Sequence, residues 1–398
     1  MKTFIFFSMP GHGHTNPILK IVNELVDKGN RVIFYSIDEF KSKIEATGAI
    51  YKGYPPALDI DPRISKNAAL AAKFAIDATE SIIPTLIDEL KKDRPDFIMY
   101  DTLALWGKAL SAKAKVPSIA FFTTIAFNTP ITRKYPSLYL TTMAQAIFTK
   151  KSVMHTFYRY RKLAKKYGFK PSSVNEFLFN KGDLNIVFTS SYFHPCIKSF
   201  DNSFKFVGPS IYERNENTDF LKRLTKNKKI IYISAGTIFN DKLHFYQTCI
   251  NAFGNSDYQV ILSLGHRFHL SDLPPIPDNI LVMNHVPQLD VLKRADIFIT
   301  HAGFNSLSES LYYGVPMLLI SQMVEQTVNA LRVQELGAGI YLKSKKVTER
   351  TLIQNVEKIL ADKNYYTNAG ILQKSLRDAG GYKKAVQEIL TFSKSKNV

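Results

Sequence analysis

Short apolar runs alternate along the chain with segments whose apolar residues recur at helical spacing. The runs that we expect to form strands are residues 3–8, 31–35, 97–100 and 118–122 in the first half, and 229–234, 259–263, 280–283, 297–300 and 317–320 in the second. Residues 17–28 carry their apolar side chains on one helical face, and a further helix is expected from about residue 105. Strands that are apolar throughout and separated by helices predict an α/β architecture, with parallel sheets covered on both faces.

Two stretches interrupt this alternation. Residues 128–180 are aromatic and basic without a strand-like run, so we expect a helical insertion that either lines a ligand pocket or packs as a surface helix pair. Residues 207–209, Val-Gly-Pro, and the polar residues 213–218 mark a boundary. We therefore divide the 398 residues into an N-terminal domain (1–208), a linker (209–225), a C-terminal domain (226–380) and a terminal segment (381–398).

The formal net charge of +18 favours anionic partners, of which nucleic acid, an anionic membrane surface and a phosphorylated substrate are the main classes. The basic residues are distributed over 159–170, 222–229 and 343–346 rather than gathered in one arm, and no nucleic-acid-binding motif is present. We therefore expect no nucleic-acid partner, and membrane association stays a subordinate alternative.

The cysteine content and the apolar runs bear on the compartment. Cys196 and Cys249 lie far apart, so neither a disulfide framework nor a zinc cluster is expected, and the chain fits a reducing compartment such as the cytoplasm. No apolar run approaches the ~20 residues that span a bilayer. Residues 1–9 lead directly into Pro10-Gly11 without a small-residue cleavage site, so we interpret them as a first strand rather than a signal peptide.

Polar residues with a capacity for chemistry are concentrated between residues 299 and 326. A helix beginning near Asn305 would present free N–H groups and its positive dipole end to an anion, and Gly303 would let the backbone approach that anion closely. His301 could add a donor to a phosphate oxygen, and Glu309, one turn into the helix, is positioned to accept from ribose hydroxyls. Taken singly, His301 is equally compatible with a core histidine and Gly303 with an ordinary loop.

A second candidate site follows the first strand, where His12 and His14 alternate with glycines. A metal site would need a third ligand at suitable spacing, and a phosphate loop would end in Gly-Lys-Ser/Thr, so a general base fits better. Neutral histidine near pH 7 can take a proton from a hydroxyl. Asp101 follows the strand at 97–100 and would lie on the same rim as His14, where it could orient the imidazole, cap a helix ahead of Leu103, or do both.

These motifs resemble the donor-binding box of the UDP-glycosyltransferase family. The resemblance rests on His-Ala-Gly-Phe-Asn-Ser-Leu-Ser-Glu at 301–309, Gly-Val-Pro at 314–316, Glu-Gln at 325–326, Val-Pro-Gln at 286–288, Gly-His-Gly-His-Thr-Asn-Pro at 11–17 and Val-Gly-Pro at 207–209. It covers essentially the whole chain and is greatest to the bacterial macrolide-type glycosyltransferases. It implies the GT-B fold, in which two Rossmann-like domains have parallel sheets facing across a cleft.

The resemblance also implies residue roles. The N-terminal domain would bind the acceptor, the C-terminal domain would bind the nucleotide sugar, and the last helix would return to the N-terminal domain. The implied donor-binding residues are Ser234, Gly236 and Thr237 on a diphosphate loop, His285, Val286 and Gln288 at the uracil and ribose, His301, Gly303, Asn305 and Ser306 at the diphosphate, Glu309 at the ribose, and Glu325 and Gln326 at the sugar hydroxyls. The family's base corresponds to His14 rather than His12, with Asp101 as its partner. The chain departs from the family at Ala235, His285 and Ala302, where Leu, a base-stacking Trp, and Gly or Cys are common.

The expected function is inverting transfer of a hexose, glucose from UDP-glucose, to a hydroxyl of a small apolar acceptor such as a macrolide, phenol or flavonoid. His14 would deprotonate the acceptor, while His301, Thr237 and the helix start at 303–306 would stabilise the departing UDP. No acidic metal cage is evident, so neither a metal nor another cofactor is expected. Three alternatives stay open: a membrane glycolipid or cell-envelope glycosyltransferase with the same chemistry, a non-catalytic nucleotide-sugar-binding protein, and a nucleotide-sugar epimerase.

Overall fold

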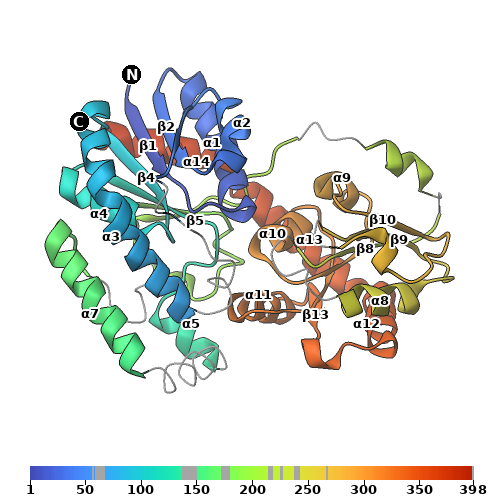
Figure 1. The fold of residues 1–398 in the computed structure, drawn as a ribbon. Helices are drawn as coiled ribbons and strands as arrows, with labels where there is room; N and C mark the ends of the chain where they lie inside the picture. Colours follow the sequence, from blue (N-terminus) through green and yellow to red (C-terminus); the bar gives the residue numbers. More distant parts are fainter. Residues whose placement is uncertain are drawn as a thin grey trace. The chain divides into compact units, whose positions relative to one another are not determined.

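The computed structural model describes residues 1–55, 58, 68–136, 150–171, 180–213, 218–224, 227–236, 243–265 and 268–396. The chain forms two compact units, the first made of Met1–Tyr212 together with Ala379–Val398 and the second of Glu213–Asp378 (Figure 1). Each unit is built on one sheet flanked by helices, so the alternation seen in the sequence corresponds to two separate α/β layers.

The sheet of the first unit is parallel throughout, in the order β3-β2-β1-β4-β5-β6-β7. Its strands are β1 (Thr3–Phe7), β2 (Arg31–Ser36), β3 (Ile50–Gly53), β4 (Phe97–Asp101), β5 (Ser118–Phe122), β6 (Leu184–Val187) and β7 (Phe204–Phe206). Every residue of β4 and β5 is buried, which explains why these strands are continuous apolar runs rather than alternating ones.

The helices of the first unit come from both ends of the chain. They are α1 (His12–Asp27), α2 (Lys41–Glu45), α3 (Ala68–Asp93), α4 (Leu105–Ala114), α5 (Thr129–Lys134), α7 (Lys150–Tyr167) and α14 (Gly381–Ser395). The last of these, red in Figure 1, packs beside α1 and β6. The ring centroids of Phe97 and Phe392 are 6.0 Å apart, so α14 shares the core of a unit whose other residues lie more than 160 positions earlier.

Helix α1 begins earlier than the sequence pattern indicated. We expected a helix from Pro17 and a glycine-rich loop before it, but the helix starts at His12, and Pro17 lies inside it. The first turn is closed by the N–H groups of His14 and Thr15, which donate to the Gly11 carbonyl at 3.0 and 2.9 Å. Proline lacks an N–H and commonly begins a helix, so the sequence favoured the later start. The correction places His14 on a helix rather than on a loop.

The second unit repeats the plan with a parallel sheet in the order β10-β9-β8-β11-β12-β13. Its strands are β8 (Ile230–Ser234), β9 (Gln259–Ser263), β10 (Ile280–Met283), β11 (Ile297–Thr300), β12 (Met317–Leu319) and β13 (Gly339–Tyr341), and its helices are α8 (Leu243–Phe253), α9 (Gln288–Leu292), α10 (Phe304–Tyr312), α11 (Val324–Glu335), α12 (Glu349–Ala361) and α13 (Lys363–Asp378). The expected apolar runs of this half agree with β8 to β12 to within one residue at each end.

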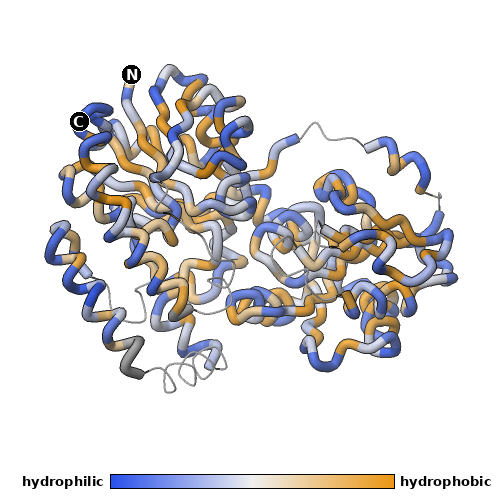
Figure 2. Tube along the Cα trace, viewed as in Figure 1, coloured by the Kyte–Doolittle hydropathy of each residue, from blue (hydrophilic) through white to orange (hydrophobic). Residues whose placement is uncertain are grey.

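The strands that the sequence pattern did not identify are the short or edge ones, β3, β6, β7 and β13. In β3 the residues are exposed or partly exposed, and β7 and β13 have only three residues each, so none presents a long apolar run. Figure 2 shows the contrast, because the central strands of both units are orange while the outer sides of the covering helices carry the blue segments.

Candidate active site

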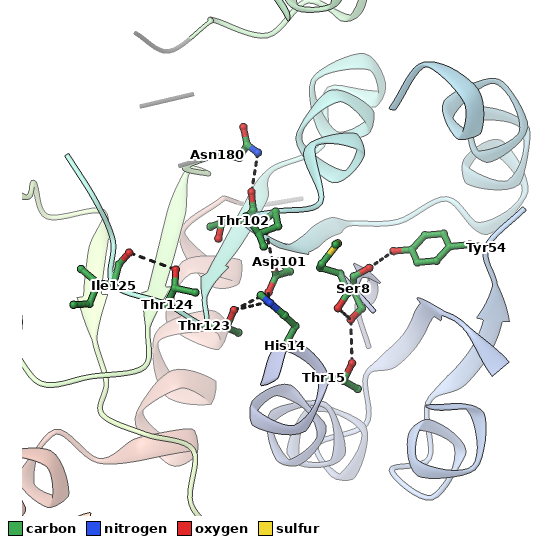
Figure 3. A network of polar contacts seen from close by, with 12 residues as sticks. Ser8, His14, Thr15, Tyr54, Asp101, Thr102, Thr123, Thr124, Ile125 and Asn180 are labelled. Atoms are coloured by element: carbon green, nitrogen blue, oxygen red, sulfur yellow. Dashed lines mark hydrogen bonds and ion pairs between the residues drawn. The ribbon is translucent and has the colours of Figure 1, made fainter. Parts of the chain in front are cut away.

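The first candidate site lies where β1 and β4 end, side by side, at the point where the strand order of the sheet reverses. Open α/β sheets bind their ligands at the carboxyl ends of the strands beside such a reversal. His14, in the first turn of α1, follows β1, and Asp101 is the last residue of β4. The Nδ1 atom of His14 lies 2.8 Å from Oδ2 of Asp101 (Figure 3). The topology thus brings together two side chains that are 87 residues apart.

Thr123 completes this group, and it was not among the residues selected from the sequence. Its Oγ1 atom lies 2.8 Å from Nδ1 of His14 and 3.0 Å from Oδ2 of Asp101. Strand β5 pairs with β4 so that Phe121 is opposite Asp101, and Thr123 follows two residues later. A hydroxyl directly after the strand next to β4 was the signal that could have identified it.

The partners of these atoms determine the tautomer of His14. Asp101 is fully buried, and its Oδ1 accepts a hydrogen bond of 2.9 Å from the Leu103 N–H. A buried carboxylate is stable only when donors surround it. We therefore assign the imidazole proton to Nδ1 of His14 and let the Thr123 hydroxyl donate to Oδ2 of Asp101. The Nε2 atom then carries a lone pair, and the side chain of His14 is 21% exposed, so a ligand can reach it.

Asp101 does not cap the helix that follows it. Helix α4 begins at Leu105 with Ala104 as the capping residue, whereas the Asp101 carboxylate bonds the N–H two residues on, before the helix starts. The expectation that Asp101 caps a helix is therefore wrong, because its carboxylate stabilises the turn that precedes α4. This turn leaves the second carboxylate oxygen directed at His14.

Hydrogen bonds to the loop after β1 fix the start of α1. Tyr54 donates to the Ser8 carbonyl at 2.7 Å, and the Ser8 and Thr15 hydroxyl oxygens are 3.3 Å apart. The indole N–H of Trp106 in turn donates to the Tyr54 hydroxyl at 3.2 Å. Burial raises the pKa of Tyr54 well above its usual range, so this phenol stays a neutral donor. The first turn of α1, and with it His14, is tied to α4 through this chain.

His12 has different neighbours from His14. Its Nε2 lies 3.1 Å from Oε1 of Glu39, both side chains are well exposed, and its ring meets Phe40 edge-on at 5.1 Å. The two imidazoles therefore do not converge on a common point with a third ligand. Among the residues that the structure describes, no group of three or more His, Cys, Asp or Glu side chains is arranged to hold a metal ion.

The second candidate site occupies the equivalent position in the other sheet. Strands β8 and β11 are neighbours where the order reverses, with Ser234 opposite Thr300, so the loops that follow them lie side by side. A Cβ atom on Gly236, whose φ is +83°, would lie 2.5 Å from Cε1 of His301, and one on Gly303 would collide with Nε2 of the same ring. The imidazole approaches both positions so closely that only glycine fits there. A side chain at either position would cover the Nε2 edge of the ring.

The imidazole of His301 is held in its neutral form. Burial lowers the pKa of His301 to about 4, and the backbone of Ser234 opposes this shift to a smaller extent. The ring is partly exposed, but its Nδ1 atom is buried and has no hydrogen-bond partner among the described residues. An unpaired buried N–H would cost more than an unpaired lone pair, so we assign the proton to Nε2. His301 then presents a neutral donor on the edge beside Gly236 and Gly303.

Ala302, between His301 and Gly303, adopts a backbone conformation that the sequence did not indicate. Its φ is +66°, in the left-handed region that L-residues other than Asn and Asp rarely enter. The Nδ2 atom of Asn329, from the buried face of α11, donates to the Ala302 carbonyl at 3.0 Å, and both residues are fully buried. Asn329 thus holds the peptide that turns the chain from β11 into α10, and it too was absent from the sequence-based selection.

A connected polar network joins α9 to α10. The amide Nε2 of Gln288 donates to Oε2 of Glu309 through a short hydrogen bond and contacts the Ser306 hydroxyl at 3.4 Å. Its Oε1 accepts from the Tyr232 hydroxyl at 3.1 Å, and burial raises the pKa of Tyr232, which keeps that phenol protonated. Gln288, expected at the uracil and ribose, therefore contacts both Ser306, expected at the diphosphate, and Glu309, expected at the ribose.

The remaining sequence-selected residues are distributed over the same unit. Asn305 is partly exposed in the first turn of α10, Glu325 and Gln326 open α11, and the Gln326 side chain accepts from the Gln322 N–H at 2.9 Å. His285 is exposed and Val286 is buried. Ser234 ends β8, and its hydroxyl accepts from the Gly236 N–H at 3.3 Å. Thr237 lies outside the described residues, as does much of the expected insertion at 128–180.

The chain is similar in sequence to known glycosyltransferases over nearly its whole length. Residues 247–380 match the family described as erythromycin biosynthesis protein CIII-like, C-terminal domain. The chain is 36% identical to the NDP-glycosyltransferase YjiC of Bacillus subtilis strain 168, over 98% of this chain and 97% of that protein. It is 33% identical to the uncharacterized UDP-glucosyltransferase YojK of the same strain, over 100% of this chain and 98% of that protein.

A solved structure gives the same answer for the fold. The glycotransferase of kitacinnamycin superposes with a TM-score of 0.85 at 27% identity, covering 98% of each chain. Two parallel sheets with polar loops at their strand-order reversals therefore define a glycosyltransferase of the GT-B fold. The chain belongs to the UDP-glycosyltransferase family, with its bacterial macrolide-type members. No helix among the described residues is long and apolar enough to cross a membrane.

Proposed function

We propose that this glycosyltransferase transfers glucose from UDP-glucose to a hydroxyl of a small apolar acceptor, such as a macrolide, phenol or flavonoid, with inversion at the anomeric carbon. The observation that carries the proposal is the 2.8 Å contact between His14 Nδ1 and the fully buried Asp101 carboxylate. This contact places the lone pair on Nε2 of His14, whose side chain is 21% exposed, beside a strand-order reversal, which is the arrangement that a general base needs.

In the proposed reaction, Nε2 of His14 removes the proton of the acceptor hydroxyl while that oxygen attacks the anomeric carbon. The bond to the UDP oxygen breaks as the new glycosidic bond forms, and the proton stays on the imidazole until solvent removes it. Asp101 stabilises the imidazolium through Nδ1, and Thr123 keeps the Asp101 carboxylate oriented. General-base catalysis of this kind contributes roughly 10²–10⁴-fold.

We propose that the second unit binds UDP-glucose. The Nε2 edge of His301 and the N–H groups at the start of α10 would donate to the diphosphate, whose charge grows as the bond breaks. The joined carboxylate and amide of Glu309 and Gln288 would hold the ribose, Val286 and His285 the uracil, and Glu325 and Gln326 the glucose hydroxyls. Ser234 and Gly236, on the loop beside His301, would contact the diphosphate, as would Thr237.

The choice of donor and acceptor rests on the names of similar proteins. YojK is described as a UDP-glucosyltransferase, which supports glucose and uridine, whereas YjiC is described more broadly as an NDP-glycosyltransferase. The family match and the structural neighbour are both described by a natural product, erythromycin and kitacinnamycin, which supports a small-molecule acceptor. We propose that the enzyme acts in the cytoplasm, in keeping with the free thiols of Cys196 and Cys249.

The decisive experiment is mass spectrometry of reactions that cross a panel of donors with a panel of acceptors. The donors are UDP-glucose, UDP-galactose, UDP-N-acetylglucosamine and dTDP-glucose, and the acceptors are a flavonoid, a simple phenol and a macrolide. We expect a product heavier by one hexose with UDP-glucose, equimolar release of UDP, and a β-linkage by NMR from the α-configured donor. The activity should persist in EDTA, since the proposed base is a histidine and not a metal-bound hydroxide.

Each alternative has its own outcome in that experiment. Interconversion of UDP-sugars in the absence of acceptor would indicate an epimerase, and UDP-glucose binding by calorimetry without any product would indicate a binding protein. An α-linked product would contradict single displacement by an acceptor activated at His14. Loss of activity in EDTA, restored by a divalent ion, would contradict the absence of a metal from the proposed mechanism.

A further inference from the structure

Basic residues are distributed along the whole chain, but most of the net positive charge comes from one segment that lacks acidic residues. Residues 102–175 contain 13 lysines and arginines and no aspartate or glutamate, whereas the other 39 basic residues share the rest of the chain with all 34 acidic ones. The segment thus supplies most of the net charge of +18. An excess of basic over acidic side chains in one segment produces a local positive electrostatic field.

Helix α7 carries much of this charge and has two different faces. Its inner face packs on α3 and α4 through Tyr160, Leu163 and Ala164, which are at most 2% exposed. The opposite side is exposed, and we call six of its residues the outer face: Met154, Tyr158, Arg161, Lys162, Lys165 and Lys166. In Figure 1 this green helix is at the edge of the first unit, and in Figure 2 its tube is largely blue or pale.

The basic residues of the outer face differ from their neighbour Arg159 in their ion pairing within the described part of the chain. Arg159, at the side of α7, pairs with Asp77 and Glu80 of α3. In contrast, no carboxylate within the described ranges forms an ion pair with Arg161, Lys162 or Lys165. The helix itself contains no acidic residue. Their charges are therefore available to an external anionic surface.

Two apolar side chains share the outer face with these charges. Met154 is 60% exposed and lies about two helical turns before the basic group, and Tyr158 is 66% exposed and lies about one turn before it. Large apolar side chains in a field of lysines are typical of helices that lie in the plane of a membrane, where the apolar groups enter the interface and the lysine stems extend along it. A surface that binds a polyanion by charge alone gains nothing from an exposed methionine.

We propose that the outer face of α7 docks this enzyme on the surface of an anionic lipid bilayer. The 18 residues of the helix span about 27 Å, enough to contact several anionic head groups at once. Docking is peripheral, through head groups and the interface. It does not depend on the proposed sugar transfer, because binding to lipid is measured without UDP-sugar or acceptor.

The test is co-flotation of the full chain with phosphatidylcholine vesicles that contain about one third phosphatidylglycerol, compared with pure phosphatidylcholine vesicles. We expect binding only to the anionic vesicles, and we expect it to disappear in 1 M salt, where the Debye length falls to about 3 Å. Each basic residue near such a surface contributes roughly fivefold to the partition coefficient. The triple variant Arg161→Glu/Lys162→Glu/Lys165→Glu should therefore bind at least ~100-fold more weakly.

A matched variant separates this face from net charge. Lys343→Glu/Lys345→Glu/Lys346→Glu alters three exposed lysines of the second unit and changes the charge by the same amount, so it should retain binding. The pair Met154→Ser/Tyr158→Ser should weaken binding to lipid while leaving binding to a soluble polyanion such as heparin unchanged. Thermal unfolding midpoints confirm that each variant is folded. The proposal would be overturned if the two triple variants lost vesicle binding equally, or if the unmodified chain bound neutral and anionic vesicles equally well. It would also be overturned if Met154→Ser/Tyr158→Ser left binding to anionic vesicles unchanged.

Discussion

His14 and His301 both follow strands at the strand-order reversals of their sheets, His14 after β1 and His301 after β11, but their Nδ1 atoms have different surroundings. Nδ1 of His14 contacts Asp101 and Thr123, each at 2.8 Å. Nδ1 of His301 is buried without a hydrogen bond in the described part of the chain, and burial lowers the pKa of this ring to about 4. One imidazole is positioned by side chains, the other by glycines and the backbone around it.

The difference assigns opposite tautomers to the two rings. The buried carboxylate of Asp101 fixes the proton of His14 on Nδ1, so its Nε2 can accept a proton. The unpartnered Nδ1 of His301 favours the proton on Nε2, so that edge can donate a hydrogen bond but resists becoming a cation. The same residue type therefore suits two tasks, general base in one unit and neutral donor to an anion in the other.

The largest effect is expected from His14→Ala. Turnover should fall by roughly 10²–10⁴-fold, because the acceptor hydroxyl loses its base, while the dissociation constant for UDP should change little. The measurements are steady-state kinetics with a phenolic acceptor and calorimetric titration of UDP. His12→Ala is the matched control, since His12 lies two residues away and pairs with Glu39 at the surface, and its turnover should stay near that of the unmodified chain. Similar losses of turnover in both variants would show that His14 is not the general base.

His301→Ala should have the second-largest effect and a different signature. Loss of one donor to the departing diphosphate costs roughly 10²–10³-fold in turnover, and here UDP affinity should fall as well. The same titration and kinetics distinguish the two histidines, because only His301 is proposed to contact the nucleotide. His244→Ala, an exposed histidine of α8, serves as the control. Unchanged UDP affinity in His301→Ala would show that the Nε2 edge does not contact the diphosphate.

Acid should destabilise the second unit through His301. The pKa of His301 is about 4 in the folded chain and about 6.5 when unfolded, so between these values only the unfolded chain binds the proton. Stability contributed by the neutral ring is therefore present above pH 6.5 and is lost as the pH falls toward 4, by on the order of 3 kcal/mol. Denaturant unfolding at pH 7 and pH 4.5 should show a smaller acid loss in His301→Gln. Identical losses in the two proteins would contradict a depressed pKa.

A smaller effect is expected from Thr123→Val, which keeps the shape of the side chain but removes the hydroxyl. The Asp101 carboxylate loses a hydrogen bond worth about 1–1.5 kcal/mol, so turnover should fall roughly tenfold with little change in UDP affinity. Thr123→Ser restores the donor and should recover most of the activity. If serine failed to rescue turnover, the methyl group rather than the hydroxyl would be the important part of Thr123.

The sequence predicted those features whose physical cause is local or periodic. Strands at 118–122 and 297–300 are continuous apolar runs because both faces of a parallel strand are buried, and their bounds agree with β5 and β11. His14 and Asp101 could be paired in advance because the carboxyl ends of neighbouring parallel strands share one rim. The sequence indicates distributed basic residues, and only the folded helix α7 shows which of them face outward.

Other features depend on partners that are distant in sequence. The start of α1 at His12 was obscured because glycines and a proline ordinarily indicate a loop. Thr123 is an unremarkable threonine until β4 and β5 pair. The role of Asn329 depends on a left-handed peptide 27 residues earlier, and alanine at position 302 gives no indication of a positive φ.

That left-handed peptide provides the smallest and most specific prediction, because it tests whether the backbone positions His301. At φ +66°, Ala302 bears a cost of about 1–2 kcal/mol that glycine would not, against an entropic cost of glycine of about 0.5–1 kcal/mol. Ala302→Gly should therefore stabilise the folded state by up to ~1 kcal/mol, measured as a higher denaturant midpoint. UDP affinity should be unchanged, because Asn329 still holds the same carbonyl. Ala330→Gly, the same change at a buried position of α11, should instead destabilise by about 1 kcal/mol. Two effects of the same sign would mean that packing around residue 302, not its backbone angle, maintains the turn on which His301 depends.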